Sequence, residues 1–178
     1  IPERSNKPRK VGLTLARDLG LGYDMAASWI EAVGEFIDYI KIRHLYVLLM
    51  SAAENDLTRR KIKLYRAHDI DVNPGGIVFE MAYLSKTVEQ TFEALAKLGF
   101  TAVELSENII PLSLEQKINA IRQAQAQGLK TLFEVGEKYP GGVKEQAARL
   151  RTEGHKIVPG KGKKPPTVAG YERRLAAL

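Results

Sequence analysis

Carboxylates and lysines able to perform acid-base and metal chemistry recur at one kind of position in this sequence. Lys41, Glu104 and Glu134 stand at or just past the end of short apolar segments, and Lys138 lies just beyond Glu134. If these segments are parallel strands, their carboxyl ends meet at one edge of a sheet, so we expect these side chains to cluster there. Such an edge is typical of a reaction that builds negative charge, because carboxylates hold Mg²⁺ and a lysine ammonium moves a proton.

A structural role is the alternative for each of these residues taken alone. Acidic and basic side chains at strand ends also pair with one another and satisfy the backbone of nearby loops. Glu104 and Glu134 each follow an apolar segment and are expected at an equivalent depth of neighbouring repeats. That equivalence favours these two glutamates as the metal ligands.

The segments that must position these side chains alternate between two types. Short runs of β-branched and apolar residues predict strands, and longer runs with helical spacing of apolar residues predict helices. Leu114, Ile118 and Ile121 recur on one face of the clearest helix, and Ser113 is placed to cap it. The predicted strands are residues 11–16, 37–42, 70–72, 102–105, 131–135 and 156–158, and the predicted helices are residues 25–33, 55–68, 88–98, 114–127 and 143–152.

This alternation predicts an α/β fold with a parallel sheet. The strands recur about every 30 residues, which is the length of a β-α-β unit. Gly99, Gly128 and Gly154 are each placed to end a helix before the next strand. We therefore expect a (β/α) barrel of the TIM type, incomplete at about six units, because eight units take about 250 residues. Its open first and sixth strands predict a homo-oligomer.

The amino-acid composition limits the cellular location and the binding partners that we expect for this chain. The chain of 178 residues contains no cysteine and carries a net charge of +6. Disulfides and thiolate chemistry are thereby excluded, and a cytoplasmic location is expected, since neither a secretory signal nor a membrane span is present. Basic residues concentrate in an N-terminal segment, 1–10, and a Pro/Gly/Lys-rich tail, 159–178, around a barrel-like domain, 11–158.

The positive charge favours an anionic partner. Neither an aromatic RNA-binding signature nor zinc-finger spacing occurs, so an anionic small molecule is expected rather than a nucleic acid. The turn around Gly75 and Gly76 would start a helix whose free backbone N–H groups receive a phosphate, although a simple turn is the alternative. His44, His68 and His155 show no ligand spacing and are not assigned to a metal.

Several short motifs follow one another in a fixed order between residues 11 and 140. Beyond residue 140 the motifs fade. They are Gly12-Leu-Thr-Leu15 with Asp18, Ile37-Asp-Tyr-Ile-Lys41, Lys61-Ile-Lys-Leu-Tyr65, Pro74-Gly-Gly76 with Phe79-Glu80, Val103-Glu-Leu-Ser106 and Glu134-Val-Gly136 with Lys138. In these motifs the sequence resembles the phosphosulfolactate synthase family, (β/α) barrel enzymes of coenzyme M biosynthesis whose relatives include a plant heat-stress-associated protein. It would be a divergent and C-terminally truncated member.

The resemblance implies a carbon-sulfur lyase that adds sulfite to phosphoenolpyruvate with the help of Mg²⁺. In that role a protonated lysine delivers a proton next to the substrate carboxylate. The implied site consists of catalytic Lys41 and Lys138, the metal ligands Glu104 and Glu134, and the substrate-binding residues Asp18, Gly75, Gly76, Glu80 and Ser106.

The sequence departs from the family after Lys41. There the family usually has a glycine-rich segment ending in Gly-Thr-Ser, whereas this chain continues Ile-Arg-His-Leu-Tyr-Val47. Leu19 stands where the family commonly has a lysine, and Glu137 replaces one of two adjacent lysines. These departures leave a second hypothesis open, a non-catalytic barrel relative that acts as a binding or assembly protein.

Overall fold

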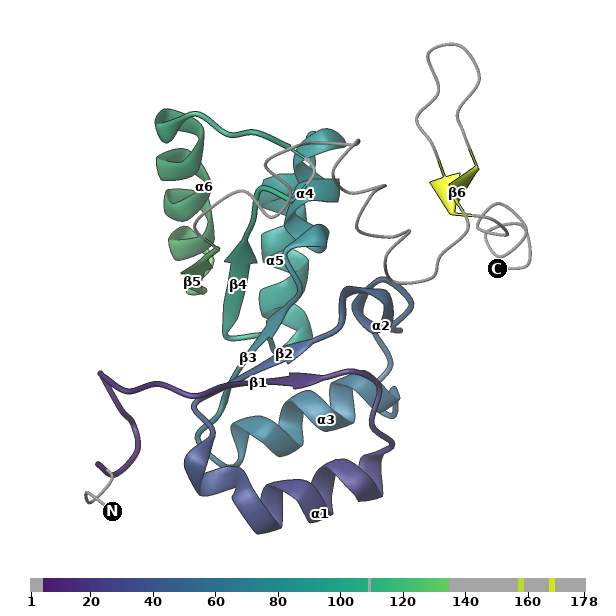
Figure 1. Cartoon of the computed structure of the whole chain (residues 1–178), viewed down its shortest axis with the longest axis vertical. Helices are drawn as coiled ribbons and strands as arrows, with labels where there is room; N and C mark the ends of the chain where they lie inside the picture. Colours follow the sequence, from purple (N-terminus) through teal and green to yellow (C-terminus); the bar gives the residue numbers. More distant parts are fainter. Residues whose placement is uncertain (1–4, 109, 135–156, 159–166, 169–178) are drawn as a thin grey trace. The chain divides into compact units, whose positions relative to one another are not determined.

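The computed structural model describes residues 5–108, 110–134, 157–158 and 167–168. The chain divides into two compact units, residues 1–135 and 136–178, which are considered separately. Helices and strands alternate through the first unit, as Figure 1 shows. Its strands are β1 (Leu15–Asp18), β2 (Tyr39–Ile42), β3 (Asp71–Pro74), β4 (Ala102–Leu105) and β5 (Lys130–Phe133), and its helices are α1 (Tyr23–Val33), the 3₁₀ turn η1 (Gly34–Phe36), α2 (His44–Leu48), α3 (Leu57–Arg66), α4 (Ile77–Leu84), α5 (Val88–Leu98) and α6 (Leu114–Ala126).

The strands of the first unit are parallel, as predicted. β1, β2 and β3 form one sheet in that order, and β4 pairs with β5 in a second. The two sheets adjoin where the Thr101 N–H donates to the Val72 carbonyl at 3.1 Å and the Val72 N–H to Thr101 Oγ1 at 2.9 Å. The α/β class is therefore confirmed, and closure into a barrel stays a prediction.

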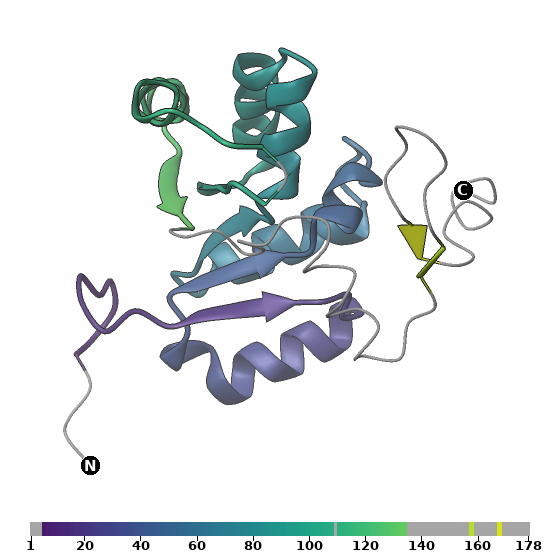
Figure 2. The same cartoon turned by 45° about the horizontal axis from the view of Figure 1, so that its top comes forward.

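Apolar side chains from alternate strand positions form the core with the helices. Ile40 and Val72 point away from the polar face of the sheet and pack with Ile30 of α1 and Ile62 of α3, all nearly inaccessible to solvent. Figure 2 shows α1 and α3 lying together along one side of the β1–β3 sheet. Each such side chain stabilises the fold by roughly 1.5–3 kcal/mol relative to an exposed one, so this layer fixes the sheet that carries the site.

Local sequence signals end and begin the helices where expected. Ser113 caps α6 in a capping box, with the Gln116 N–H donating to Ser113 Oγ at 3.2 Å and the Ser113 N–H to Gln116 Oε1 at 2.7 Å. Gly99 follows α5 with φ +100°, a left-handed conformation that favours glycine. Gly128 has φ +72° just after α6.

The elements β1 and α2 differ from the expectation. β1 begins at Leu15 rather than at residue 11, since Gly12 turns the chain with φ +64° and leaves Val11 exposed. The short helix α2 was not expected. The predicted helix 143–152 lies outside the described residues.

The strand predicted at residues 156–158 is present as β6 (Ile157–Val158), but it does not extend the parallel sheet. It pairs antiparallel with β7 (Thr167–Val168), within a tail expected to be a loop. The connection 159–166 is shorter than the dozen or so residues that a parallel crossover needs. Its length therefore permits a hairpin and excludes a parallel pair.

The basic N-terminal segment is bound to the body of the first unit. Lys7 Nζ donates to the carbonyls of Gly34 at 2.7 Å and His68 at 3.0 Å, just past the ends of α1 and α3. Arg9 pairs with Asp38 at 2.9 Å. Cations are stabilised at helix carboxyl ends, so these charges hold the segment in place. No helix among the described residues is long and apolar enough to cross a membrane.

Candidate functional site

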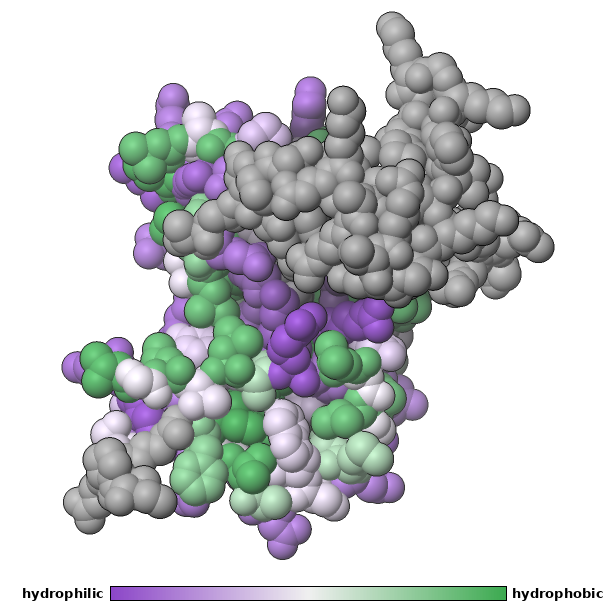
Figure 3. Space-filling model, in the orientation of Figure 1, coloured by the Kyte–Doolittle hydropathy of each residue, from purple (hydrophilic) through white to green (hydrophobic). Residues whose placement is uncertain are grey.

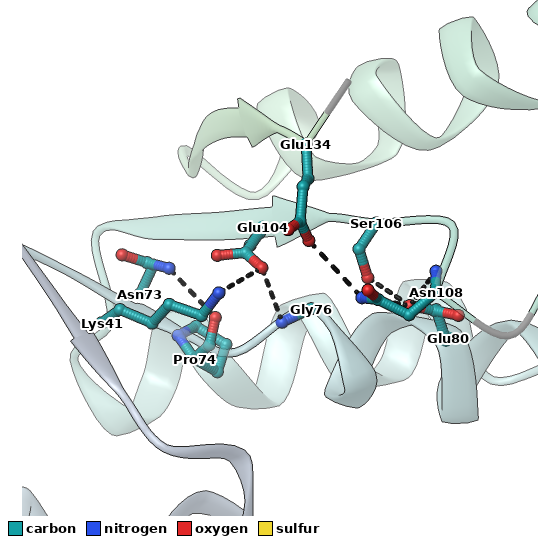
Figure 4. Close-up of polar contacts among 9 residues, drawn as sticks. All are labelled: Lys41, Asn73, Pro74, Gly76, Glu80, Glu104, Ser106, Asn108 and Glu134. Atoms are coloured by element: carbon teal, nitrogen blue, oxygen red, sulfur yellow. Dashed lines mark hydrogen bonds and ion pairs between the residues drawn. The ribbon is translucent and has the colours of Figure 1, made fainter. Parts of the chain in front are cut away.

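Lys41 and Glu104 meet at the carboxyl ends of the strands, as predicted from their sequence positions. Lys41 Nζ lies 2.6 Å from Glu104 Oε1, with side-chain exposures of 22% and 8% (Figure 4). Glu104 Oε1 also accepts a hydrogen bond from the Gly76 N–H at 3.3 Å. An ammonium, a carboxylate and a helix-start amide thus converge at this edge of the sheet.

The turn after β3 needs glycine at one of its two positions. A Cβ at Gly76 would lie 2.2 Å from Ser106 Oγ and 3.0 Å from Glu104 Oε1, whereas a Cβ at Gly75 would make ordinary contacts at 3.5 Å or more. Gly76 precedes the first residue of α4, so the predicted strand, turn and helix start are present. The absence of a side chain at Gly76 lets β4 approach the turn, and reception of a phosphate here stays a prediction.

Glu80 and Ser106, both expected to bind substrate, contact each other. The fully buried Glu80 carboxylate accepts hydrogen bonds from the Ser106 hydroxyl, from the Asn108 backbone at 3.0 Å and from the Ile110 backbone at 3.2 Å. These bonds fix the loop that follows β4. A direct contact of either residue with substrate remains a prediction.

Glu134 lies at the same edge, directly after β5. Its N–H donates to the Leu105 carbonyl at 3.1 Å, and its Oε2 lies 3.5 Å from Asn108 Nδ2. Asn108 Nδ2 also donates to Glu80 at 3.1 Å, so this amide links two carboxylates. The sequence analysis did not single out Asn108, although its place just beyond Ser106 and the end of β4 was an available signal. Lys138 lies outside the described residues.

Asp18 ends β1 and is fully buried in a polar network. Its carboxylate pairs with Lys61 Nζ at 2.6 Å and accepts the Tyr65 hydroxyl at 2.8 Å and the Gly20 and Leu21 amides at 2.8 and 2.9 Å. Burial alone would raise the pKa of Asp18, but these hydrogen bonds together lower it below its ordinary value. Burial and the Asp18 charge raise the pKa of Tyr65. These contacts fix the β1–α1 loop, and substrate binding by Asp18 stays a prediction.

The segment after Lys41 forms α2 and packs onto the same loop. A Cβ at Gly20 would lie 2.2 Å from Tyr46 Oη, so the phenol occupies the space beside this glycine. His44 is half-buried at the start of α2, and burial, Arg43 and Lys41 lower its pKa. The imidazole is therefore neutral at neutral pH.

The donor set at this edge fits Mg²⁺ held partly by water and substrate. Glu104 receives both of its hydrogen bonds on Oε1, which leaves Oε2 without a partner among the described residues. Figure 4 shows the Glu104 and Glu134 side chains extending from β4 and the end of β5 toward Gly76 and Asn108. Within the described ranges no group of three or more His, Cys, Asp or Glu is arranged around a metal. Mg²⁺ often keeps several waters and uses one or two carboxylates, so the two glutamates could hold it, and metal binding here stays a prediction.

Comparison with known proteins identifies relatives of this chain. Phosphosulfolactate synthases from Methanothermobacter thermautotrophicus and Methanocaldococcus jannaschii are each 35% identical to this chain, over 78% and 72% of it. A phosphosulfolactate synthase from Bacillus subtilis is 28% identical over 78% of the chain. The matched regions cover 53%, 50% and 52% of those proteins, so the chain spans about half the length of the curated relatives it matches.

The family match extends beyond residue 140, where the recognisable motifs fade, and covers residues 2–160. The similarity to the family is therefore longer than the motifs alone indicate. Over most of its length, this chain belongs to the (2R)-phospho-3-sulfolactate synthase (ComA) family.

Proposed function

We propose that this chain acts as a phosphosulfolactate synthase, adding sulfite to phosphoenolpyruvate. The observation that carries the proposal is the Lys41–Glu104 pair, held at 2.6 Å beside the Gly76 amide at the carboxyl edge of parallel strands. The names of the relatives give the product, and the resemblance described above implies sulfite and phosphoenolpyruvate as the substrates. The pair supplies a proton donor and a carboxylate where a β/α fold places its chemistry.

The reaction forms one carbon-sulfur bond and moves one proton. The sulfur lone pair of sulfite attacks the methylene carbon, and the electrons of the double bond pass to the neighbouring carbon and its carboxylate. Lys41 Nζ gives a proton to that carbon, the phosphate ester stays intact, and solvent restores the lysine proton. Glu104 holds the ammonium in place before the reaction.

Other groups at the carboxyl edge of the sheet would stabilise the negative charges of the substrate. When bound by Glu104 and Glu134, Mg²⁺ would stabilise the negative charge that develops on the substrate carboxylate. The Gly76 N–H lies at the start of α4, where the helix dipole favours an anion such as the ester phosphate. Both groups act on charges that water would otherwise solvate.

The test supplies the full chain with phosphoenolpyruvate, sulfite and Mg²⁺ and follows the phosphorus NMR signal of the product together with loss of sulfite. Lys41→Met should abolish turnover, because it removes the proton donor. Lys97→Met is the matched control, since Lys97 pairs with Glu93 on the exposed side of α5. Turnover by Lys41→Met equal to that of the wild type would reject Lys41 as the acid.

A second candidate function is a non-catalytic relative that binds the anion without converting it. The observation in its favour is α2, which stands at the sequence position where the family usually has a glycine-rich segment. Tyr46 of α2 fills the space beside Gly20. Calorimetric binding of phosphoenolpyruvate in the presence of Mg²⁺, with no product after long incubation with sulfite, would select this function over the enzyme.

We also propose that the chain forms a homo-oligomer through the free edge of β1. Among the described strands, β1 pairs only with β2, and Val11, Leu13 and Leu15 next to or on this edge are 77%, 47% and 44% exposed. Figure 3 shows apolar side chains along the line that β1 follows in Figure 1. Sedimentation should reveal a dimer or larger species, and Leu13→Lys should dissociate it. A monomer that unfolds cooperatively at low concentration would contradict the proposal.

A further inference from the structure

Asn73 carries a buried acceptor that has no donor. The residue is inaccessible to solvent near the carboxyl end of β3, and its Oδ1 has no hydrogen-bond partner among the described residues. Its Nδ2 donates to the Pro74 carbonyl at 3.0 Å, which fixes the orientation, because the reversed amide would place two oxygens together. Buried polar atoms without a partner are rare and call for an explanation.

Asn73 stands on β3, the strand between those that carry the two charged residues of the site. Lys41 and Asn73 are paired in register on adjacent parallel strands, so their side chains share one face of the sheet. Glu104 stands on β4, the next strand along, so the Lys41–Glu104 ion pair crosses β3, as Figure 4 shows beside Asn73. The ammonium has three donor hydrogens and uses one of them on Glu104.

We propose that Asn73 is a positioning residue that accepts the Lys41 ammonium whenever Glu104 is engaged elsewhere. The inference deepens the proposed function, because there Glu104 turns to Mg²⁺. A metal on that carboxylate would repel the ammonium and weaken Glu104 as its acceptor. Asn73 Oδ1 is neutral, has no donor among the described residues and belongs to the residue paired in register with Lys41 on the adjacent strand.

This second acceptor keeps the proton donor at the site. Without it, an ammonium released from Glu104 would turn to solvent, which already reaches 22% of the Lys41 side chain. With it, the Lys41 ammonium stays beside the sheet and would be separated from the carboxylate that holds the metal. Lys41 thus alternates between a charged partner in the free protein and a neutral partner in the loaded one.

A pair of double-mutant cycles tests this without metal or substrate. Lys41→Met and Asn73→Leu are introduced into the full chain, each alone and both together. The same set is made in the wild-type background and in the Glu104→Leu background, and the free energy of unfolding in urea is measured for each variant. On the wild-type background the two effects should add. On Glu104→Leu they should deviate from additivity by roughly tenfold in the unfolding constant, as expected for a hydrogen bond to a charged group. Additivity on both backgrounds would overturn the proposal.

A spectroscopic measurement covers the case in which a variant does not fold. The side-chain amide signal of Asn73 is followed in asparagine-labelled wild-type chain and identified by its loss in Asn73→Ser. Addition of Mg²⁺ that binds by calorimetry should shift this signal in the wild type and not in Lys41→Met. An unmoved signal, or an equal shift in Lys41→Met, would overturn the assignment, the latter by showing that the metal itself contacts Asn73. Absence of Mg²⁺ binding would instead count against the proposed function, and the metal-free cycles would still decide the role of Asn73.

Discussion

Lys41 and Glu104 face each other across β3, with 2.6 Å between Nζ and Oε1, although 63 positions separate them in the sequence. Each neutralises the other in the free protein. Glu104 also accepts a hydrogen bond from the Gly76 N–H, so this carboxylate of β4 contacts the ends of both β2 and β3. The proposed chemistry requires this pair to separate, and the predictions below follow from the groups that surround it.

Glu104→Gln should lower kcat/KM by about two orders of magnitude, the lower end of the contribution of acid-base catalysis, because Lys41 loses the charge that holds it. The unfolding free energy should fall by about 1 kcal/mol, since the lysine is partly exposed and keeps a neutral acceptor. Steady-state kinetics and urea unfolding measure both. Glu93→Gln, which removes an exposed pair on α5, is the control and should change neither. Unaltered turnover by Glu104→Gln would contradict the assignment.

Glu134→Gln should weaken Mg²⁺ binding while leaving stability nearly unchanged. Among the described residues its side chain has one long hydrogen bond, 3.5 Å to Asn108, so the loss in unfolding free energy should stay within about 0.5 kcal/mol. Calorimetric titration with Mg²⁺ and thermal unfolding test the two parts separately. A large loss of stability with an unchanged response to Mg²⁺ would show that Glu134 is a structural residue.

The two glycines of the turn should respond differently to alanine. Gly76→Ala places a Cβ 2.2 Å from Ser106 Oγ, and Ser106 is itself bound to buried Glu80, so overpacking should cost about 1–3 kcal/mol. Gly75→Ala, the matched control, meets its neighbours at ordinary distances and should be nearly neutral. Urea unfolding of both variants measures the difference. Equal costs would mean that backbone conformation, and not contact with Ser106, selects glycine here.

Acid should weaken the fold partly through Asp18. Its pKa is lowered in the folded chain, so the unfolded chain binds the extra proton near the ordinary value of 3.8. The contribution of Asp18 is fully present above the unfolded pKa and is lost as pH falls through the folded pKa. The pKa values of Asp38 and Asp56 are also lowered, so these two residues contribute to the same loss of stability in acid.

The variant to titrate is Asp18→Asn combined with Lys61→Met, because Asp18→Asn alone leaves a buried ammonium unpaired at a cost of about 3–5 kcal/mol. Unfolding free energies measured between pH 6 and pH 3 should fall less steeply in the double variant than in the wild type. Parallel curves would show that Asp18 does not contribute to acid unfolding.

The sequence by itself determined the parts of this protein that depend on nearby residues. The alternation of strands and helices, the bounds of α5 at residues 88–98, the Ser113 cap and the glycine ends of helices follow from local periodicity and backbone preferences. The placement of Lys41, Glu104 and Glu134 at one edge followed as well, because parallel strands in β-α-β units all end on the same side.

Only the tertiary structure decided which of these groups touch. Glu80 binds Ser106 and Asp18 binds Lys61, and neither partner is close enough in sequence for local patterns to reveal it. The unpaired oxygen of Asn73 is likewise visible only once β2 and β4 flank β3. Contacts between distant residues depend on strand order and register, which the packing of the whole unit selects, whereas the residue types at strand ends are compatible with many pairings.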